Sequence, residues 1–224
     1  FSVAPRLAEI WLDKVTELPA GAASTAAWSR AEWIENTIGT WQVMIEPVAA
    51  HVVASMGDAL PAEAKAMAGP LAGMLNKAGG AMFGQQAGSA IGTLATEVLS
   101  STDVGLPLGP EHTAAVLTHN VAKLAADLEA SEADVLLYVM LRECAHHRLY
   151  AHAPWLRGAV LGAIEDFAKG IKIDVTSIEE QMRSVDPMNP EAMGEALSGG
   201  LFDPRPTPEQ ERAKERLELL LALV

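Results

Sequence analysis

The chain has 224 residues, half of them apolar, with 29 acidic against 16 basic side chains and a net charge of −13. This length is sufficient for one globular domain with a substantial core. So acidic a surface repels phosphate groups, which excludes nucleic-acid binding as an expected function and disfavours membrane binding for the same reason. Cys144 has no partner cysteine, and the N-terminal segment has no export-signal pattern, so we expect a cytoplasmic protein.

The composition predicts an all-α protein. Alanine, leucine, methionine and glutamate dominate, and alternating strand-like runs are nearly absent. We expect a single compact multi-helix domain over residues 1–224, with a helical half at 1–102, a Gly/Pro-rich linker at 103–110 and a second helical half at 111–224. Because an apolar helical run is still in progress at 219–224, the domain is expected to be truncated at its C-terminus.

The N-terminal half is expected to begin with a connection over residues 19–27. A capping box then predicts a helix start, because Ser29 and Glu32 can each bond the backbone amide of the other. Apolar residues repeat at helical spacing up to Pro47, which is expected to end or kink this helix. A second helical stretch is expected at 48–60.

A glycine-rich helix follows, with Gly80, Gly84, Gly88 and Gly92 recurring every four residues. Each glycine costs a helix about 1 kcal/mol relative to alanine. Close packing of another helix on this ridge is the expected compensation; a hinge and a membrane-spanning segment are the alternatives.

The C-terminal half also predicts a series of helices. Ser131 is expected to cap one of them, and Thr207 with Gln210 forms a second capping box. The expected helices cover residues 113–129, 131–152, 155–170, 174–185 and 189–197, with a last helix from Thr207 onward.

One of these helices carries most of the candidate chemistry. Residues 135–141 are apolar all round and are expected to be buried, and the ionisable sequence RECAHHRLYAH continues the same helix over 142–152. Burying such groups costs several kcal/mol unless they are paired or bind a metal. This stretch is therefore either a satisfied polar network or a functional site.

The spacing approaches that of a zinc peptidase. In His-Glu-x-x-His, two imidazoles on one helix face bind zinc while the glutamate acts on zinc-bound water. Here Glu143 occupies the position of the base and His146 that of the second ligand, but Arg142 stands where the first histidine would be. A guanidinium has no lone pair to donate to a metal, so the usual two-histidine pair cannot form.

Several alternatives remain open at this point. Glu143 and His146 also have the Glu-x-x-His spacing of di-iron proteins, but no second copy is present. Glu143 and His147 are four residues apart and could be joined by His152. A buried network in which Arg142, Glu143 and His146 pair with acids of other helices is the non-functional interpretation. Cys144 is expected to be a small buried residue, and the isolated His51, His112 and His119 are expected at the surface or at helix caps.

Motifs across most of the chain resemble one known family. They are residues 33–47, FGQQAG at 83–88, DVGLPLGP at 103–110, RECAHHRLY at 142–150, DPMNPE at 186–191, and GLFDP at 200–204 leading to TPEQ at 207–210. In these the chain resembles the actinobacterial zincin-like metallopeptidase type 2 family, whose members are labelled zinc-dependent metalloproteases or hydrolases and sometimes associated with deazaflavin coenzyme biosynthesis.

The resemblance implies a helical zincin-like domain with zinc as cofactor. By that analogy Glu143 is the general base and His146 a zinc ligand, with a further ligand beyond Val224. His147 is a second candidate ligand, and Arg142 and His152 are further site candidates. The expected function is that of a zinc metallopeptidase homologue with a degenerate motif, acting on or binding a peptide or protein. The alternative is a non-catalytic helical scaffold, a pseudoenzyme that retains the fold.

Overall fold

The computed structural model describes residues 3–58, 69–169 and 207–224. The helices expected at 174–185 and 189–197 lie outside these residues. The described elements are α1 (Val3–Leu12), β1 (Ser24–Ala27), α2 (Arg30–Asp58), α4 (Gly69–Leu94), β2 (Thr113–Val116), α5 (Thr118–Asp127), α6 (Glu132–His152), α7 (Pro154–Lys169) and α10 (Pro208–Leu221).

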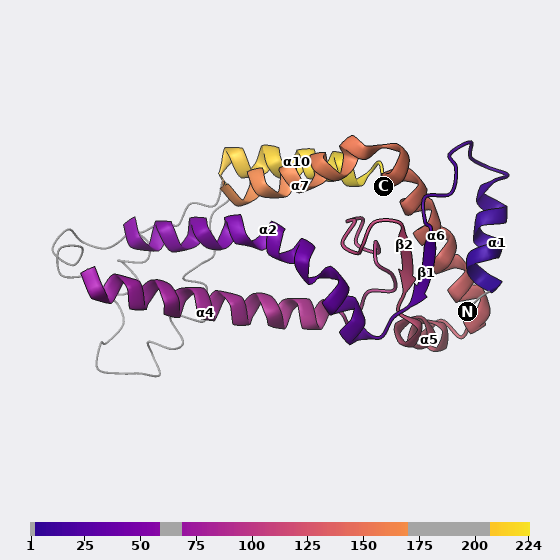
Figure 1. Ribbon diagram of the computed structural model, residues 1–224, viewed down its shortest axis with the longest axis horizontal. Coiled ribbons are helices and arrows are strands. Elements are labelled where there is room, and N and C mark those ends of the chain that lie inside the picture. The colour runs from indigo at the N-terminus through magenta and orange to yellow at the C-terminus, as the bar shows by residue number, and fades with distance from the viewer. Residues whose placement is uncertain (1–2, 59–68, 170–206) are drawn as a thin grey trace.

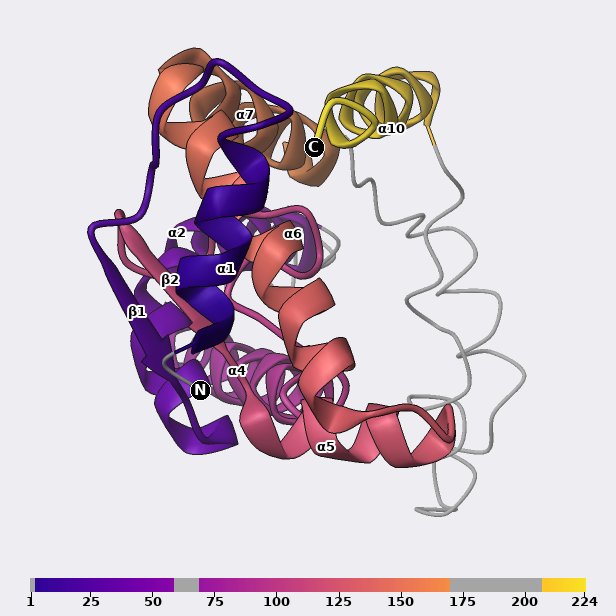
Figure 2. The same ribbon diagram turned by 90° about the vertical axis from the view of Figure 1, so that its right-hand side faces the viewer.

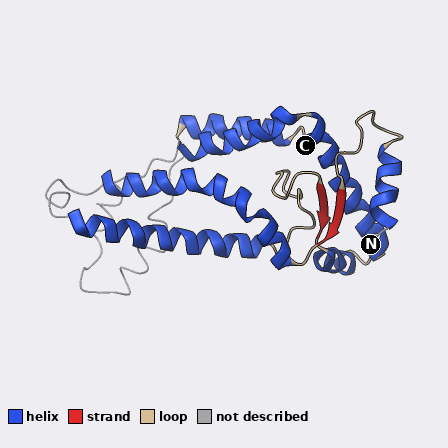
Figure 3. Cartoon of the chain, viewed as in Figure 1, coloured by secondary structure: helices blue, strands red, loops and turns tan. Residues whose placement is uncertain are grey.

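The helices form two long pairs that extend from a smaller mixed region. In Figure 1, α2 runs beside α4 and α7 runs beside α10, while the two strands, α1, α5 and α6 gather at the other end. Figure 3 shows how small the sheet is beside the helices. The C-terminal helix thus packs on α7, and the N-terminal helix packs on α6.

The structure is mostly helical, as expected, and departs from an all-α fold only in a small sheet. β1 pairs with β2 in parallel, from Ser24 opposite Thr113 to Ala27 opposite Val116. The helix expected over 113–129 therefore begins only at Thr118, and the connection expected over 19–27 ends in a strand. The fold is mostly helical with a two-stranded sheet.

Burial on both faces explains why β2 was not recognised. Ala114 and Val116 belong to a core with α1, α5 and α6, whereas Ala115 belongs to a second core with α2 and α4. Successive residues of a strand point to opposite faces, so a strand between two cores shows no polar–apolar alternation. The alanines of this strand resemble a helix in composition, and tertiary packing overrides that preference.

Local sequence signals at the helix ends were mostly reliable. The Ser29 hydroxyl accepts from the Glu32 amide at 3.2 Å, and the Glu32 carboxylate accepts from the Ser29 amide at 2.7 Å. The capping box of Thr207 and Gln210 is also present. Ser131 is the N-cap residue of α6, as expected, but its side chain makes no capping hydrogen bond. Helix α2 continues past Pro47, which therefore does not end it.

Among the described residues, no other helix packs on the glycine ridge of α4. A Cβ atom added to Gly80, Gly84, Gly88 or Gly92 would meet nothing within 4 Å among the described residues. Close packing on this ridge therefore stays a prediction, since none of the described residues provides it. Within residues 3–58, 69–169 and 207–224, none of the helices combines the length and apolar character needed to cross a membrane.

Close backbone approach occurs instead at Gly21. A Cβ atom there would lie 2.1 Å from the carbonyl oxygen of His147 and 2.7 Å from the amide nitrogen of Arg148. Only a glycine allows the chain that leads into β1 to lie so closely against α6.

Alanine substitutions at Gly21 and Gly84 should therefore change the free energy of unfolding in opposite directions. Gly21→Ala forces the backbone away from α6 and should lower the free energy of unfolding by about 1–3 kcal/mol. Gly84→Ala adds a methyl group in open space and should raise it by up to about 1 kcal/mol through helix propensity. Urea denaturation of both variants measures the difference. A Gly21→Ala variant as stable as the parent would contradict the close approach.

Candidate functional site

Helix α6 is packed on three sides, which brings its ionisable residues into the interior. It contacts α1, α5 and β2, and Figure 2 shows α1 lying alongside it. Val139, Met140 and Cys144 are buried in the core. Tyr138, however, is 63% exposed, so the expectation that residues 135–141 are buried all round is wrong on one face.

Glu143 is fully buried and its carboxylate accepts five hydrogen bonds. Oε1 accepts from the hydroxyl of Ser101, the amide of Ala115 at 3.3 Å and Nε2 of His147 at 3.2 Å. Oε2 accepts from the amide of Thr102 at 3.2 Å and from its hydroxyl at 2.6 Å. The donors come from the segment before the 103–110 loop, from β2 and from α6 itself, so this carboxylate joins three parts of the chain.

These donors keep Glu143 ionised. Burial is the largest influence and opposes the charge, but the hydrogen bonds and positive charge of His147, together with the bond from Ser101, outweigh it. The net result is a pKa below the usual value. An ionised carboxylate only accepts hydrogen bonds, so His147 must donate through Nε2 and its Nδ1 carries the lone pair when the ring is neutral.

The same reasoning fixes the protonation of His146. Thr102 has a single hydroxyl proton, which it donates to Glu143, so it must accept from Nδ1 of His146 at 2.7 Å. The Nε2 atom of His146 therefore carries the lone pair. Burial, followed by the positive charge of Arg142, lowers the pKa of His146 and favours this neutral form.

Arg142 pairs with an acid outside its own helix rather than with Glu143. Its guanidinium forms an ion pair with the Asp103 carboxylate and donates to the Asp103 carbonyl at 2.8 Å. The other carboxylate oxygen of Asp103 accepts from the Leu99 amide at 2.9 Å. The side chain of Arg142 is 41% exposed, so the expected fully buried network of Arg142, Glu143 and His146 is wrong for Arg142.

The residues in the positions of the zinc motif do not fit a zinc ion. Arg142 replaces the first ligand and is held by Asp103, and both oxygens of Glu143 are occupied. No group of three His, Cys, Asp or Glu side chains within the described ranges is arranged to hold a metal ion. His146 alone keeps a lone pair at this position.

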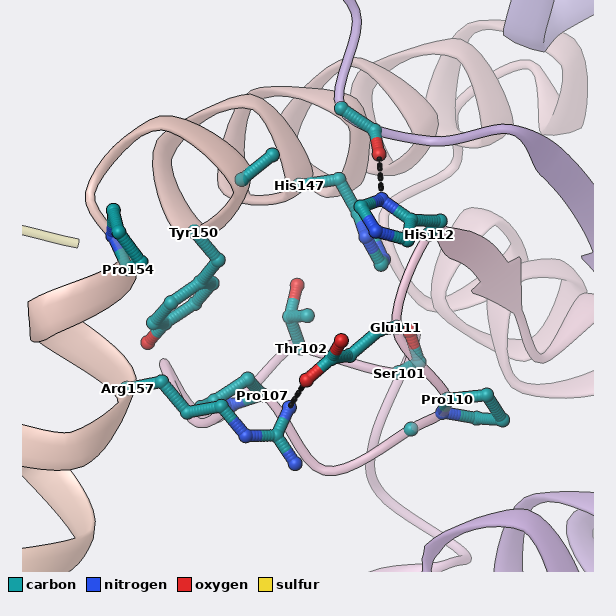
Figure 4. Close-up of a pocket in the computed structure, with 13 residues that line it drawn as sticks. Ser101, Thr102, Pro107, Pro110, Glu111, His112, His147, Tyr150, Pro154 and Arg157 are labelled. Carbon is teal, nitrogen blue, oxygen red and sulfur yellow. Dashed lines mark hydrogen bonds and ion pairs between the residues drawn. The ribbon is translucent and has the colours of Figure 1, made fainter.

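A pocket of about 200 Å³ lies beside the motif, between the 101–112 segment, α6 and α7 (Figure 4). Tyr150 donates to the carbonyl of Gly105 at 2.6 Å, and burial raises the pKa of Tyr150 to about 12. Arg157 approaches Glu111 at 4.0 Å, the longest of the ion pairs described. His147 and His112 also line this pocket, whereas His146 does not.

The other candidate residues have structural contacts. His152 Nε2 donates to the Pro19 carbonyl at 3.1 Å and lies outside the pocket. Cys144 is buried against Met140, as expected, and burial raises its pKa, which makes it a poor nucleophile.

Sequence reasoning missed four important residues. Ser101 and Thr102 bond to groups more than 40 positions away, and a hydroxyl pair before a loop gives no periodic signal. His112 was expected to be an isolated histidine. Arg148 is buried and pairs with Glu9 and Asp13 of the N-terminal segment; an arginine at an apolar helix position was its only sequence signal.

A pH dependence of stability follows from the protonation of His146. The unfolded histidine takes up a proton near its ordinary pKa of 6.5, whereas the buried ring does so only at lower pH. The unfolded state therefore binds more protons, and the free energy of unfolding should fall as the pH drops below about 6.5. In His146→Gln, whose amide can still donate to Thr102, this contribution disappears. Urea denaturation between about pH 7 and pH 5 measures it; equal slopes for parent and variant would contradict it.

Comparison with known proteins supports the fold. The pattern described as zincin-like metallopeptidase matches residues 2–224. No curated protein matches the chain significantly. Among solved structures, the chain is similar to the "Crystal structure of a putative hydrolase with a novel fold from Chloroflexus aurantiacus", with 16% identity over 99% of this chain and 70% of that chain and a TM-score of 0.52. At this identity the likeness concerns the fold alone. With a family match over almost its whole length, the chain belongs to the zincin-like metallopeptidases.

Proposed function

We propose that this chain is a non-catalytic zincin-like protein, in which the motif helix holds the 101–105 segment and so shapes a binding pocket. The proposal rests on one observation: the two carboxylate oxygens of Glu143 already accept five hydrogen bonds from the protein. A general base must reach the proton of a bound water through a free lone pair, at a heavy-atom distance of about 2.6–3.2 Å. A fully buried carboxylate with a lowered pKa is poorly suited to this role.

The other residues of the motif bind the same segment. Glu143 accepts from Ser101 and Thr102, His146 donates to Thr102, and Arg142 pairs with Asp103. Two turns further on, Tyr150 donates to the carbonyl of Gly105. Arg142, Glu143, His146 and Tyr150 recur at helical spacing, so one side of α6 meets the turns of the 101–105 segment almost residue by residue.

This segment forms one side of the pocket. Ser101 and Thr102 line it, and Tyr150, which holds the segment at Gly105, lines it from α6 (Figure 4). In this proposal the positive charge of Arg142 stands where a metal ion would stabilise the same region in an active zincin. The pocket then serves to bind a partner rather than to cleave a peptide.

The second candidate is a zinc-dependent hydrolase. The family match favours it, and the structure from Chloroflexus aurantiacus that shares the fold is titled a "putative hydrolase". The Nε2 lone pair of His146 is the specific feature in this chain that would suit a metal. Association with deazaflavin coenzyme biosynthesis stays a prediction from the resemblance, and a cytoplasmic location stays a prediction from the single cysteine and the N-terminal sequence.

The two candidates differ in what Glu143→Gln should do. In the proposed role, the new amide group faces hydroxyl and amide donors, so the variant should lose on the order of 3 kcal/mol of unfolding free energy. Glu35→Gln, an exposed change on α2, is the matched control and should change stability little. Urea denaturation of both variants, with a peptide-library assay of the parent, makes the comparison.

One result would overturn the proposed function. If the parent cleaves peptides, and Glu143→Gln unfolds like the parent but has lost that cleavage, Glu143 acts as a base and the protein is a hydrolase. A destabilised Glu143→Gln variant from a parent that cleaves nothing supports the non-catalytic role.

A further inference from the structure

The hydroxyl groups that line the pocket donate their protons to the protein itself. Those of Ser101 and Thr102 donate to the Glu143 carboxylate, and that of Tyr150 donates to the Gly105 carbonyl at 2.6 Å. A hydroxyl group has one proton and two lone pairs. Toward a ligand in the pocket, these oxygen atoms therefore act as hydrogen-bond acceptors.

The two histidines of the pocket each have one ring nitrogen fixed as a donor. His112 donates through Nδ1 to the Gly21 carbonyl at 2.8 Å, because a carbonyl can only accept. His147 donates through Nε2 to the ionised Glu143 at 3.2 Å. In a neutral imidazole the other nitrogen is an acceptor. This side of the pocket thus suits a ligand group that brings hydrogen-bond donors.

Arg157 is the charged donor of the pocket. Its only ion pair among the described residues is with Glu111, at 4.0 Å, and the side chains are 31% and 71% exposed. Such a pair contributes little to stability. Burial raises the pKa of Tyr150, and the charge of Arg157 opposes that rise, so this charge acts within the pocket. A guanidinium held by one long contact can turn toward a second carboxylate and bind it through two parallel hydrogen bonds.

The charged donor and the imidazole acceptors lie on different sides of a small pocket. Figure 4 shows Arg157, from α7, apart from the rings of His112 and His147, with Thr102 between them. The volume of about 200 Å³ is below the range of about 300–1,000 Å³ that is usual for drug-sized ligands. Apolar side chains complete much of the lining, namely those of Pro107, Pro110, Ala151 and Pro154.

We propose that this pocket binds a free amino acid with an apolar side chain. The carboxylate of such a ligand fits Arg157, and its ammonium group brings several donors to the acceptors of the opposite side. The ionised Glu143 behind His147 favours a cationic group there. Because a zwitterion has no net charge, the overall charge of −13 does not repel it. The prolines suit an apolar side chain, and the small volume suits a single amino acid.

This inference deepens the proposed function and rests on it in treating the pocket as a binding site. The two can fail separately, because ligand affinity is measured directly, whereas the proposed function is tested by peptide cleavage and by the stability of Glu143→Gln. Cleavage that depends on Glu143 would overturn the proposed function alone. A non-cleaving parent that binds no amino acid would overturn this inference alone.

Calorimetric titration of the full chain with L-leucine, L-valine and L-alanine tests the proposal at about pH 8, where ordinary imidazoles are neutral. At least one of these amino acids should bind with one molecule per chain. It should bind at least about tenfold more tightly than analogues that lack the amine or the carboxylate, since each analogue loses a charged contact. For L-leucine the analogues are isocaproate and isopentylamine. Inorganic phosphate is the probe for a general anion site.

Substitutions in the pocket should change this affinity in different directions. Arg157→Gln should weaken binding at least about tenfold, because it removes the charged donor. Glu111→Gln should strengthen binding by up to about fivefold, because Glu111 competes with the ligand for Arg157. His112→Asn, which tolerates the φ of 61° at this position, should weaken binding at least about threefold by withdrawing an acceptor. Arg6→Gln on α1 and His119→Asn on α5 are exposed matched controls and should bind as the parent does.

The proposal is overturned if the parent binds none of the three amino acids, if Arg157→Gln binds them as tightly as the parent, or if Glu111→Gln binds them more weakly. It is also overturned if isocaproate or phosphate binds as tightly as L-leucine, because the pocket would then recognise an anion only. Urea denaturation should show that Arg157→Gln is folded, since this variant loses only a long ion pair between partly exposed side chains.

Discussion

The buried negative charge of Glu143 is the constraint on which most of this structure depends. An ionised carboxylate without partners in a protein interior costs several kcal/mol, so it is tolerated only where donors are already in position. Here the donors are two side-chain hydroxyls, two backbone amides and an imidazole. They belong to the segment before the 103–110 loop, to β2 and to the next turn of α6. Satisfying one carboxylate therefore fixes the positions of three segments that are far apart in the sequence.

A second buried charge, Arg148, fixes the segments that pack on the opposite side of α6. Arg148 is almost fully buried, pairs with Glu9 and Asp13, and donates to the Leu18 carbonyl at 2.7 Å. Glu143 thus holds β2 and the 101–102 segment, while Arg148 holds α1 and the chain that follows it. Because hydrogen bonds to charged groups weaken steeply with poor geometry, the two residues together define where α6 lies between the small sheet and α1. The position of α6 in turn determines where its pocket-lining residues His147 and Tyr150 lie.

The sequence predicted α6 well and the elements around it poorly, for physical reasons that differ. The expected helix 131–152 agrees with Glu132–His152, because apolar spacing and Pro154 are local signals. Strand β2 could not be predicted, because its alanines are buried between two cores and only distant neighbours decide its conformation. The partners of Glu143 could not be predicted either. Ser101 and Thr102 carry no local signal, because only the fold brings their hydroxyl groups to a carboxylate about 40 positions away. The replacement of a histidine by Arg142 was visible, but its pairing with Asp103 depends on the path of the loop.

The difference between this helix and a zinc peptidase helix can be stated as a rotation. In the peptidase motif the two ligands are four residues apart, and the positions corresponding to them here are Arg142 and His146. Glu143 and His147 are also four residues apart, but one residue along, which turns them by about 100° around the helix axis. The direct contact within α6 is between Glu143 and His147. Arg142 and His146 instead bind the 102–103 segment. The face of α6 that meets the pocket is therefore that of His147, and the glutamate in the position of the base has become the group that orients this ring.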